Sequence, residues 1–236
     1  MQRPIGNNSI IPSALFFLIV GASWISVQGQ SLPPARYDGF TYTNHRVDAD
    51  TIMIEAFFNP LCPDSRDSWP PLKQALKHYG SRLSLVIHLL PLPYHDNAFA
   101  ASRALHIVNM VNKDATFQLL EWFFQNQKRF YNAQTLNMSR VAVVDEIVKS
   151  ATQALGNSFY HVLESGFNDR KTDQKTRISF KYSTSKGVFG TPFFYVNGFL
   201  LPDVGSPLDY SGWKRLIDSL LRAQGLKTEE PMHYLL

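Results

Sequence analysis

Two apolar segments joined by a helical pattern constrain this chain more than any other feature. Thr51–Phe58 and Leu83–Leu90 are nearly continuous apolar runs, which is the pattern of strands buried on both faces. Between them a helical pattern begins at Cys62-Pro63 and ends at Gly80. Because strand, helix and strand follow one another so closely, they predict a βαβ unit in which the two strands lie parallel.

The middle of the chain indicates a helical insertion. From His95 to Lys186, alanine, leucine and phenylalanine recur at helical spacing, and the alternation typical of strands is almost missing. The expected helices cover Asn97–Val111, Ala115–Phe130, Ser139–Leu155, Ser158–Gly166 and Asp169–Ser185.

Strands return after this insertion. Phe193–Val196 is aromatic and apolar, and Asn197-Gly198 is typical of a two-residue hairpin turn that leads back through Phe199–Leu201. A last amphipathic helix is expected over Tyr210–Gln224. The pattern as a whole predicts an α/β fold with one large helical insertion.

Composition excludes several classes of function. The chain of 236 residues has one cysteine, so it forms no internal disulfide and no cysteine zinc site. The seven histidines are scattered without metal-ligand spacing, and we interpret His88, inside an apolar strand, as a core residue. No metal site or resident cofactor is therefore expected. The net charge of +4 is mild and no dense Lys/Arg block occurs, which argues against nucleic-acid binding.

Residues 1–29 have the pattern of a secretory signal peptide. Arg3 precedes the apolar run Ile10–Val20, and small residues suit cleavage near Gly29. An uncleaved signal anchor is the alternative, but serines and a glycine make the span poor for a bilayer core, so no stable membrane insertion is expected after cleavage. The C-terminus does not resemble a KDEL-type retrieval signal. We therefore expect the secretory pathway, with an extracellular or post-reticulum destination.

One further tripeptide fits that destination. Asn137-Met138-Ser139 is an N-glycosylation sequon, which is usable only in the secretory pathway, although such tripeptides also arise by chance. The last residues, 227–236, are expected to form a disordered tail.

Cys62 is the first candidate for chemistry. It follows a strand, and Pro63 suits the first position of a helix, so the sulfur is expected at a helix N-terminus. The helix dipole and the free N–H groups there favour a thiolate, whereas the nearby carboxylate of Asp64 opposes it. The alternative is a buried, inert cysteine, which is the commoner fate of a lone cysteine.

The segment from Gly187 to Gly198 is the second candidate. It combines glycines, the Thr191-Pro192 pair, an apolar strand and the Asn197-Gly198 turn. A proline directly before a strand suits a cis peptide bond, which would turn the Thr191 backbone outward for an extended peptide to dock as an added strand. A trans proline on an edge strand is the alternative.

Together, Phe57–Ser65 and Gly190–Gly198 resemble the thioredoxin superfamily, and within it the DsbA-like branch. The first segment is similar to that branch's aromatic strand and Cys-Pro-x-Cys turn, and the second to its cis-proline loop. The resemblance implies a thioredoxin-like fold, a mixed central sheet flanked by helices, made of residues 30–94 and 187–226. It also implies that residues 95–186 are the inserted helical subdomain of this branch.

The resemblance further implies roles for individual residues. Cys62 would be the attacking thiol, and Pro63, Asp64, Thr191 and Pro192 would face the substrate. Protein or peptide thiols would be the partners, with glutathione as a candidate co-substrate. No cofactor is implied.

The motif departs from the family at its second cysteine, because Ser65 stands where the resolving cysteine belongs. A dithiol site releases a mixed disulfide by intramolecular attack, which gains a large effective concentration, and serine cannot do this. Ser65 could still donate a hydrogen bond to the thiolate. Glu55 is the sole candidate for the acidic residue that relatives use in proton transfer, and the alternative is a solvent-facing or salt-bridged residue at the strand end.

Two functions follow and both stay open. The first is monothiol-type thiol–disulfide exchange through Cys62. The second is a non-catalytic peptide- or protein-binding thioredoxin-fold protein that has lost redox turnover. A glutathione-conjugating transferase is a more distant third, since a fold alone does not select a function.

Overall fold

The structure is a computed structural model that describes residues 34, 36–42, 51–202 and 207–225. The chain divides into two compact units, Met1–Tyr37 and Asp38–Leu236, and the elements below belong to the second. The signal peptide expected over residues 1–29 and the tail expected over 227–236 lie outside the described residues.

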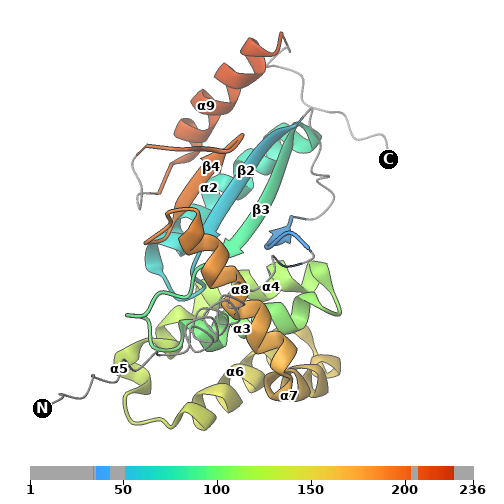
Figure 1. The fold of residues 1–236 in the computed structure, drawn as a ribbon, viewed down its shortest axis with the longest axis vertical. Coiled ribbons are helices and arrows are strands. Elements are labelled where there is room, and N and C mark those ends of the chain that lie inside the picture. The colour runs from blue at the N-terminus through green and yellow to red at the C-terminus, as the bar shows by residue number, and fades with distance from the viewer. Residues whose placement is uncertain (1–33, 35, 43–50, 203–206, 226–236) are drawn as a thin grey trace, which may run out of the picture. The chain divides into compact units, whose positions relative to one another are not determined.

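A mixed sheet forms the centre of the second unit (Figure 1). Its order is β1-β3-β2-β4-β5. β2 and β3 are parallel, as the βαβ pattern predicted, and every other neighbouring pair is antiparallel. The strands are β1 (Phe40–Thr41), β2 (Ile52–Phe58), β3 (Leu83–Leu89), β4 (Phe193–Val196) and β5 (Phe199–Leu200).

Helices flank the sheet and form the insertion between β3 and β4, which confirms the predicted fold class. Figure 1 shows α3, α4, α6 and α7 gathered beyond one end of the sheet. The α-helices are α2 (Pro63–Tyr79), α3 (Ala98–Asn109), α4 (Lys113–Asn126), α5 (Asn132–Thr135), α6 (Arg140–Leu155), α7 (Tyr160–Asn168), α8 (Arg170–Ser185) and α9 (Tyr210–Ala223). Short 3-10 helices are η2 (Gly80–Arg82), η3 (Gln127–Phe130) and η4 (Asn157–Phe159).

The alternation of side chains along β2 divides the core into two layers. Ile54 and Phe58 belong to the large cluster that includes residues of α2 and α9, such as Leu72 and Trp213. Phe57 belongs instead to a smaller cluster with residues of the segments after β3 and before β4, against which Tyr182 of α8 packs. α2 and α8 therefore cover opposite faces of β2.

Some elements of the structure differ from what the sequence patterns indicated. The sequence patterns did not indicate β1, because two residues are too few to show a period. The helix expected over Ala115–Phe130 ends as an α-helix at Asn126 and continues as the 3-10 turn η3. This tighter turn occurs where Gln127, a polar residue, is buried against the chain after β2.

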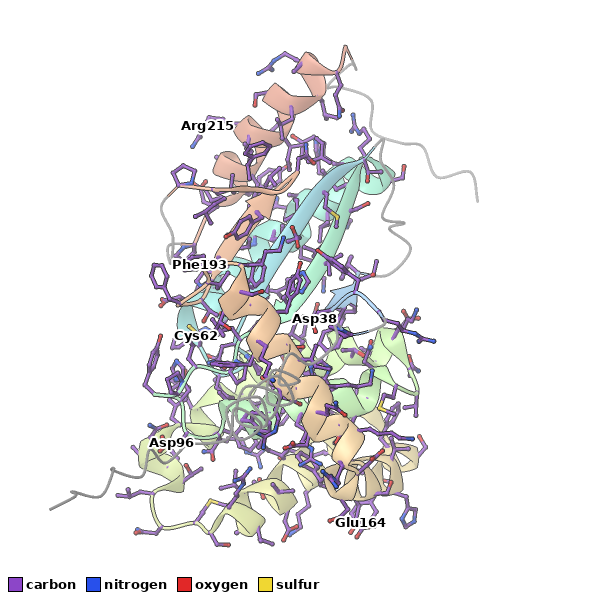
Figure 2. All side chains as sticks on the ribbon, in the orientation of Figure 1. Asp38, Cys62, Asp96, Glu164, Phe193 and Arg215 are labelled. Atoms are coloured by element: carbon purple, nitrogen blue, oxygen red, sulfur yellow. The ribbon has the colours of Figure 1, made fainter. Side chains whose placement is uncertain are left out.

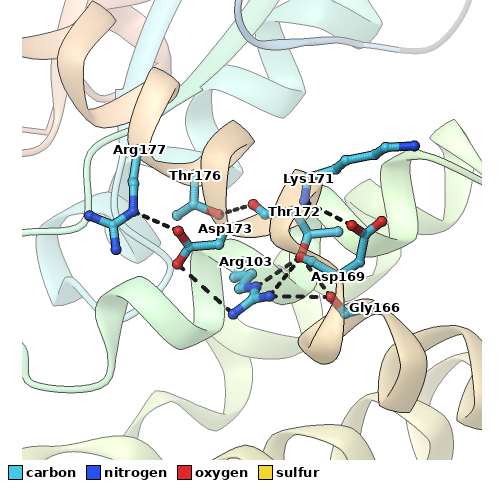
Figure 3. Close-up of polar contacts among 8 residues, drawn as sticks. All are labelled: Arg103, Gly166, Asp169, Lys171, Thr172, Asp173, Thr176 and Arg177. Atoms are coloured by element: carbon cyan, nitrogen blue, oxygen red, sulfur yellow. Dashed lines mark hydrogen bonds and ion pairs between the residues drawn. The ribbon is translucent and has the colours of Figure 1, made fainter.

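Arg103 joins three helices of the insertion (Figure 3). From α3, its Nε donates to Thr172 Oγ1 at 2.8 Å and its Nη2 to the Asp169 carbonyl oxygen at 2.9 Å. Thr172 Oγ1 in turn donates to the carbonyl oxygen of Gly166 in α7 at 2.6 Å. These bonds satisfy a guanidinium and carbonyl groups that would otherwise be costly to bury, so they fix the start of α8 against α3 and α7.

A buried polar cluster lies between β3, α3 and α8. Asp38 accepts a hydrogen bond from Ser179 Oγ at 2.6 Å and lies 3.0 Å from His88 Nδ1. Ser179 Oγ also contacts His106 Nε2 at 3.0 Å. Burial lowers the pKa of His106 to about 4, against a smaller opposite effect of Asp38. For His88, burial acts to lower the pKa, but hydrogen bonds to Asp38 and Glu55 outweigh it, so that the pKa is raised.

These two shifts predict opposite pH dependences of stability. In the unfolded chain His106 becomes protonated near pH 6.5, whereas in the folded chain it stays neutral down to about pH 4. The contribution of neutral His106 to the free energy of unfolding is therefore complete above pH 6.5. About 3 kcal/mol of it is lost as the pH falls towards 4. Stability from His88 is complete below pH 6.5 and is lost as the pH rises through its raised pKa.

We expect His106→Gln to flatten the dependence of the unfolding free energy between pH 6.5 and 4.5, because glutamine keeps a polar contact but does not titrate. Urea denaturation of both proteins at several pH values measures this, and the contribution of His88 is common to both. Parallel curves for the two proteins would show that His106 does not carry the acid sensitivity.

Candidate functional site

Cys62 occupies the N-cap position of α2. Its backbone is extended, with φ −89° and ψ 124°, and Pro63 follows at the start of the helix. Figure 2 shows Cys62 where the chain passes from β2 into α2. The residue is 4% exposed, and the thiol donates a hydrogen bond to the Thr191 carbonyl oxygen, with Sγ and O 3.3 Å apart. Two segments 129 residues apart in sequence thus meet at this sulfur.

The turn before Cys62 is held by local hydrogen bonds. Asn59 accepts from the N–H of Leu61 through Oδ1 at 2.9 Å and from the N–H of Cys62 through its carbonyl oxygen at 3.0 Å. Ser65 is fully buried, and its Oγ accepts from the N–H of Asn59 at 3.2 Å. Ser65, in the first turn of α2, therefore stabilises the loop that precedes the helix. The sequence did not indicate this contact.

The loop before β4 forms the other side of the thiol. The Thr191–Pro192 peptide bond is cis, and both residues are buried. Thr191 Oγ1 is one of the buried polar atoms that have no hydrogen-bond partner within the described part of the chain. Phe189 is 80% exposed and its ring lies edge-on to that of Phe193, with centroids 5.0 Å apart. The loop thus presents an apolar ring to solvent close to the buried pair.

Residues after β3 form a third wall. Partial burial raises the pKa of Tyr94, and the charges of Cys62 and Asp64 raise it further. The side chain of Tyr94 is therefore close enough to the thiol to interact with it electrostatically. Burial lowers the pKa of His95, against smaller opposite effects of Asp64 and Asp96. Tyr94 is 60% exposed, Asp64 is exposed and Pro63 is half-buried. The site is therefore an acidic and aromatic surface around a buried sulfur.

Glu55 lies elsewhere in the fold. It is buried on the face of β2 opposite to α2, where it accepts a hydrogen bond from Tyr182 Oη at 3.0 Å and lies 3.4 Å from His88 Nε2. Figure 2 shows Asp38, the other carboxylate beside His88, well separated from Cys62. The structure groups Glu55 with this polar cluster, and its role in proton transfer stays a prediction.

Asn137 lies on an exposed turn between α5 and α6. Ser139, the third residue of the sequon, is the N-cap of α6 and accepts from the N–H of Ala142 at 3.1 Å. The sequon is therefore on the surface, at a position where its serine also stabilises a helix.

Gln127 and Tyr131 are site residues that the sequence did not reveal. Gln127 Nε2 donates to the carbonyl oxygens of Pro60 at 3.1 Å and Cys62 at 2.8 Å. Tyr131 Oη donates to Gln127 Oε1 at 3.0 Å. No spacing rule links these residues to Cys62, because the contact joins the insertion to the start of α2. The one signal in the sequence is a glutamine within an aromatic helical segment.

Two classes of feature are missing from the described residues. No group of three or more His, Cys, Asp or Glu residues in ranges 36–42, 51–202 and 207–225 could hold a metal ion. No helix in the same ranges is long and apolar enough to cross a membrane.

Solved structures share this fold at low sequence identity. A candidate protein-disulfide isomerase from Pseudomonas syringae superposes with a TM-score of 0.62 at 18% identity, covering 75% of this chain and 96% of that one. BdbD from Bacillus subtilis, in its oxidised form, gives 0.60 at 12% identity, with 79% and 100% covered. A periplasmic thioredoxin-like protein from Salmonella enterica serovar Typhimurium gives 0.54 at 17% identity, with 78% and 90% covered.

The structural matches show the fold, and a comparison of the sequence with protein families identifies the family. None of the curated proteins matches this sequence significantly. A family model described as Thioredoxin matches residues 47–219, which is well over half of the chain and includes both Cys62 and the Thr191–Pro192 loop. This chain therefore belongs to the thioredoxin family and is a DsbA-like member of it, with a helical insertion between β3 and β4 and a single cysteine.

Proposed function

We propose that this protein catalyses monothiol-type thiol–disulfide exchange through Cys62 in the secretory pathway. The observation that carries the proposal is the hydrogen bond of 3.3 Å between Cys62 Sγ and the Thr191 carbonyl oxygen. It brings a sulfur at a helix N-terminus, where a thiolate is favoured, against the backbone of the cis-proline loop. Membership of the DsbA-like branch supports protein thiols as the partners.

The first step forms a mixed disulfide. The Cys62 thiol loses its proton to solvent, and the thiolate attacks one sulfur of a partner disulfide. A bond forms between Sγ and that sulfur, the partner's S–S bond breaks, and the second partner sulfur leaves as a thiolate. Once Cys62 is ionised it no longer donates to Thr191, so the Thr191 carbonyl oxygen becomes available to accept an N–H of an extended partner.

The second step needs a thiol from outside the site. Ser65 is a hydroxyl, and its Oγ accepts a hydrogen bond from Asn59 within the turn. A thiolate of glutathione or of another partner cysteine must therefore attack the partner's sulfur in the mixed disulfide. That attack forms a new partner disulfide and returns Cys62 as a thiolate, so the two steps exchange one disulfide for another without net oxidation or reduction.

Peptide or protein binding without turnover is the second candidate. The burial of Cys62 favours it, because a cysteine that is only 4% exposed must be uncovered before its sulfur can attack. Iodoacetamide labelling as a function of pH separates the two. Rapid labelling at neutral pH supports exchange. A labelling rate whose dependence on pH matches that of an ordinary cysteine thiol supports binding alone. Mass spectrometry of protein purified without reductant would identify any group attached to Cys62.

Ser65→Cys tests the geometry of the proposed site. A second sulfur at this position should attack Cys62 Sγ in the mixed disulfide, which releases the partner thiol and leaves a disulfide between Cys62 and the introduced cysteine. With dithiothreitol to reduce that disulfide again, we expect insulin reduction to rise by roughly an order of magnitude over the parent protein. The variant should also lose about 1 kcal/mol of stability, since a thiol is a weaker acceptor for the Asn59 N–H than a hydroxyl.

Two controls make this test specific. Ser65→Ala should lose similar stability without gaining reductase activity, and the double variant Cys62→Ser/Ser65→Cys should not reduce insulin. A folded Ser65→Cys protein with no gain in activity would count against Cys62 as the attacking thiol.

Secretion is tested through Asn137. Protein made in a eukaryotic secretory system should carry a glycan that peptide N-glycosidase removes, and Asn137→Gln should abolish this shift in electrophoretic mobility. Ser139→Thr should keep both the glycan and the cap of α6, whereas Ser139→Ala should lose the glycan and about 1 kcal/mol of stability. An unmodified Asn137 in secreted protein would refute the glycosylation, and retention of the protein in the cytosol would refute the location.

A further inference from the structure

We infer that Gln127, oriented by Tyr131, is a positioning residue that fixes the Cys62 turn for thiol chemistry. The inference rests on the proposed function of Cys62 and assigns part of that site to the helical insertion. Gln127 begins η3, directly after α4, and its side chain is almost completely buried.

The amide of Gln127 bridges two carbonyl groups of the turn. Nε2 donates to Pro60 O at 3.1 Å and to Cys62 O at 2.8 Å, so both of its hydrogens are used. Both bonds are buried, so Gln127 compensates part of the hydration that the two carbonyl oxygens lose on folding. A single side chain therefore restrains the chain on both sides of Leu61, in addition to the local bonds of Asn59 and Ser65.

Tyr131 determines which way the amide points. Its hydroxyl donates to Gln127 Oε1 at 3.0 Å, which assigns the oxygen to that side and directs Nε2 towards the turn. If Tyr131 lost its hydroxyl, the amide would keep its donors but lose the contact that selects their direction. Tyr131 therefore acts on Cys62 through Gln127.

The bond to the Cys62 carbonyl bears directly on the sulfur. That oxygen accepts from Gln127 and also from the N–H of Arg66 at 3.1 Å, the first bond of α2. Two donors fix the plane of the peptide group that follows Cys62, and with it the direction in which the side chain leaves the backbone. The Gln127 N–H group also compensates the negative end of a carbonyl dipole close to the site where the thiolate charge develops.

A second side chain of the same segment holds a different wall of the site. Asn132, at the start of α5, donates from Nδ2 to the Tyr94 carbonyl oxygen at 3.1 Å and accepts from the N–H of Asp96 through Oδ1 at 3.0 Å. Its contacts lie on the loop of Tyr94 rather than on the Cys62 turn. Variants of Gln127 should therefore change the reactivity of the thiol itself, whereas variants of Asn132 should change the binding of the partner that approaches it.

Gln127→Met tests the inference, because methionine has a similar size but donates no hydrogen bond. We expect the second-order rate of iodoacetamide labelling of Cys62 at pH 7 to fall roughly threefold to tenfold, with the midpoint of the pH–rate profile moved to higher pH and the limiting rate at high pH retained. Gln125→Met, an exposed position in α4, is the matched control and should label like the parent protein.

Two further variants extend the test. Tyr131→Phe should change the profile in the same direction by a smaller factor, and the double variant Gln127→Met/Tyr131→Phe should be no slower than Gln127→Met alone, because Tyr131 acts through Gln127. Asn132→Ala should leave iodoacetamide labelling unchanged and raise the KM for a peptide disulfide with little effect on kcat.

The outcomes distinguish this inference from the proposed function. If the parent protein exchanges disulfides but a folded Gln127→Met variant has the parent's pH–rate profile, the positioning role is refuted. A variant that melts earlier yet keeps that profile refutes it equally, since the role would then be purely structural. If Gln127→Met does not fold, an unchanged profile for Tyr131→Phe overturns the inference. If Cys62 of the parent protein never forms a mixed disulfide, the proposed function fails, while the change in labelling still decides the role of Gln127.

Discussion

The hydrogen bond between the Cys62 thiol and the Thr191 carbonyl oxygen is the contact on which the rest of the site depends. It exists because β4 lies antiparallel beside β2, so that the loop before β4 and the turn after β2 meet at the same edge. The parallel pairing of β2 with β3 brings the loop of Tyr94 to that edge as well. Because the sheet has both parallel and antiparallel strands, the turn after β2, the loop after β3 and the loop before β4 lie together around the Cys62 sulfur.

The helical insertion is part of this arrangement and does more than add volume. Its Gln127 satisfies two carbonyl groups of the Cys62 turn, and its Asn132 holds the loop that carries Tyr94. Arg103 and the polar contacts of Thr172 secure its own helices farther away. Buried polar groups need partners with defined geometry, so these bonds restrict how the insertion packs against the site more tightly than apolar contacts would.

Ser65 stands where the resemblance to the DsbA-like branch implies a resolving cysteine, and this bears on both the chemistry and the contacts of the site. A serine cannot release a mixed disulfide, which leads to the proposed dependence on an outside thiol. Its hydroxyl is also a better acceptor than a thiol, and the structure uses it to hold the N–H of Asn59. The hydroxyl of Ser65 therefore has a structural role in the turn around Cys62. Glu55 belongs to a different environment, with His88 and Tyr182 on the far face of β2.

The sequence by itself determined most of the elements and indicated the family. Apolar periodicity located β2, α2 and β3, and the Thr191-Pro192 and Asn197-Gly198 pairs located the second segment, because turn, proline and strand signals act between near neighbours in the chain. The tertiary structure alone decided the partner of Ser65, the face on which Glu55 lies and the contact of Gln127 with the Cys62 turn. These depend on the direction of side chains and on pairing between distant segments, which no local pattern of residues encodes.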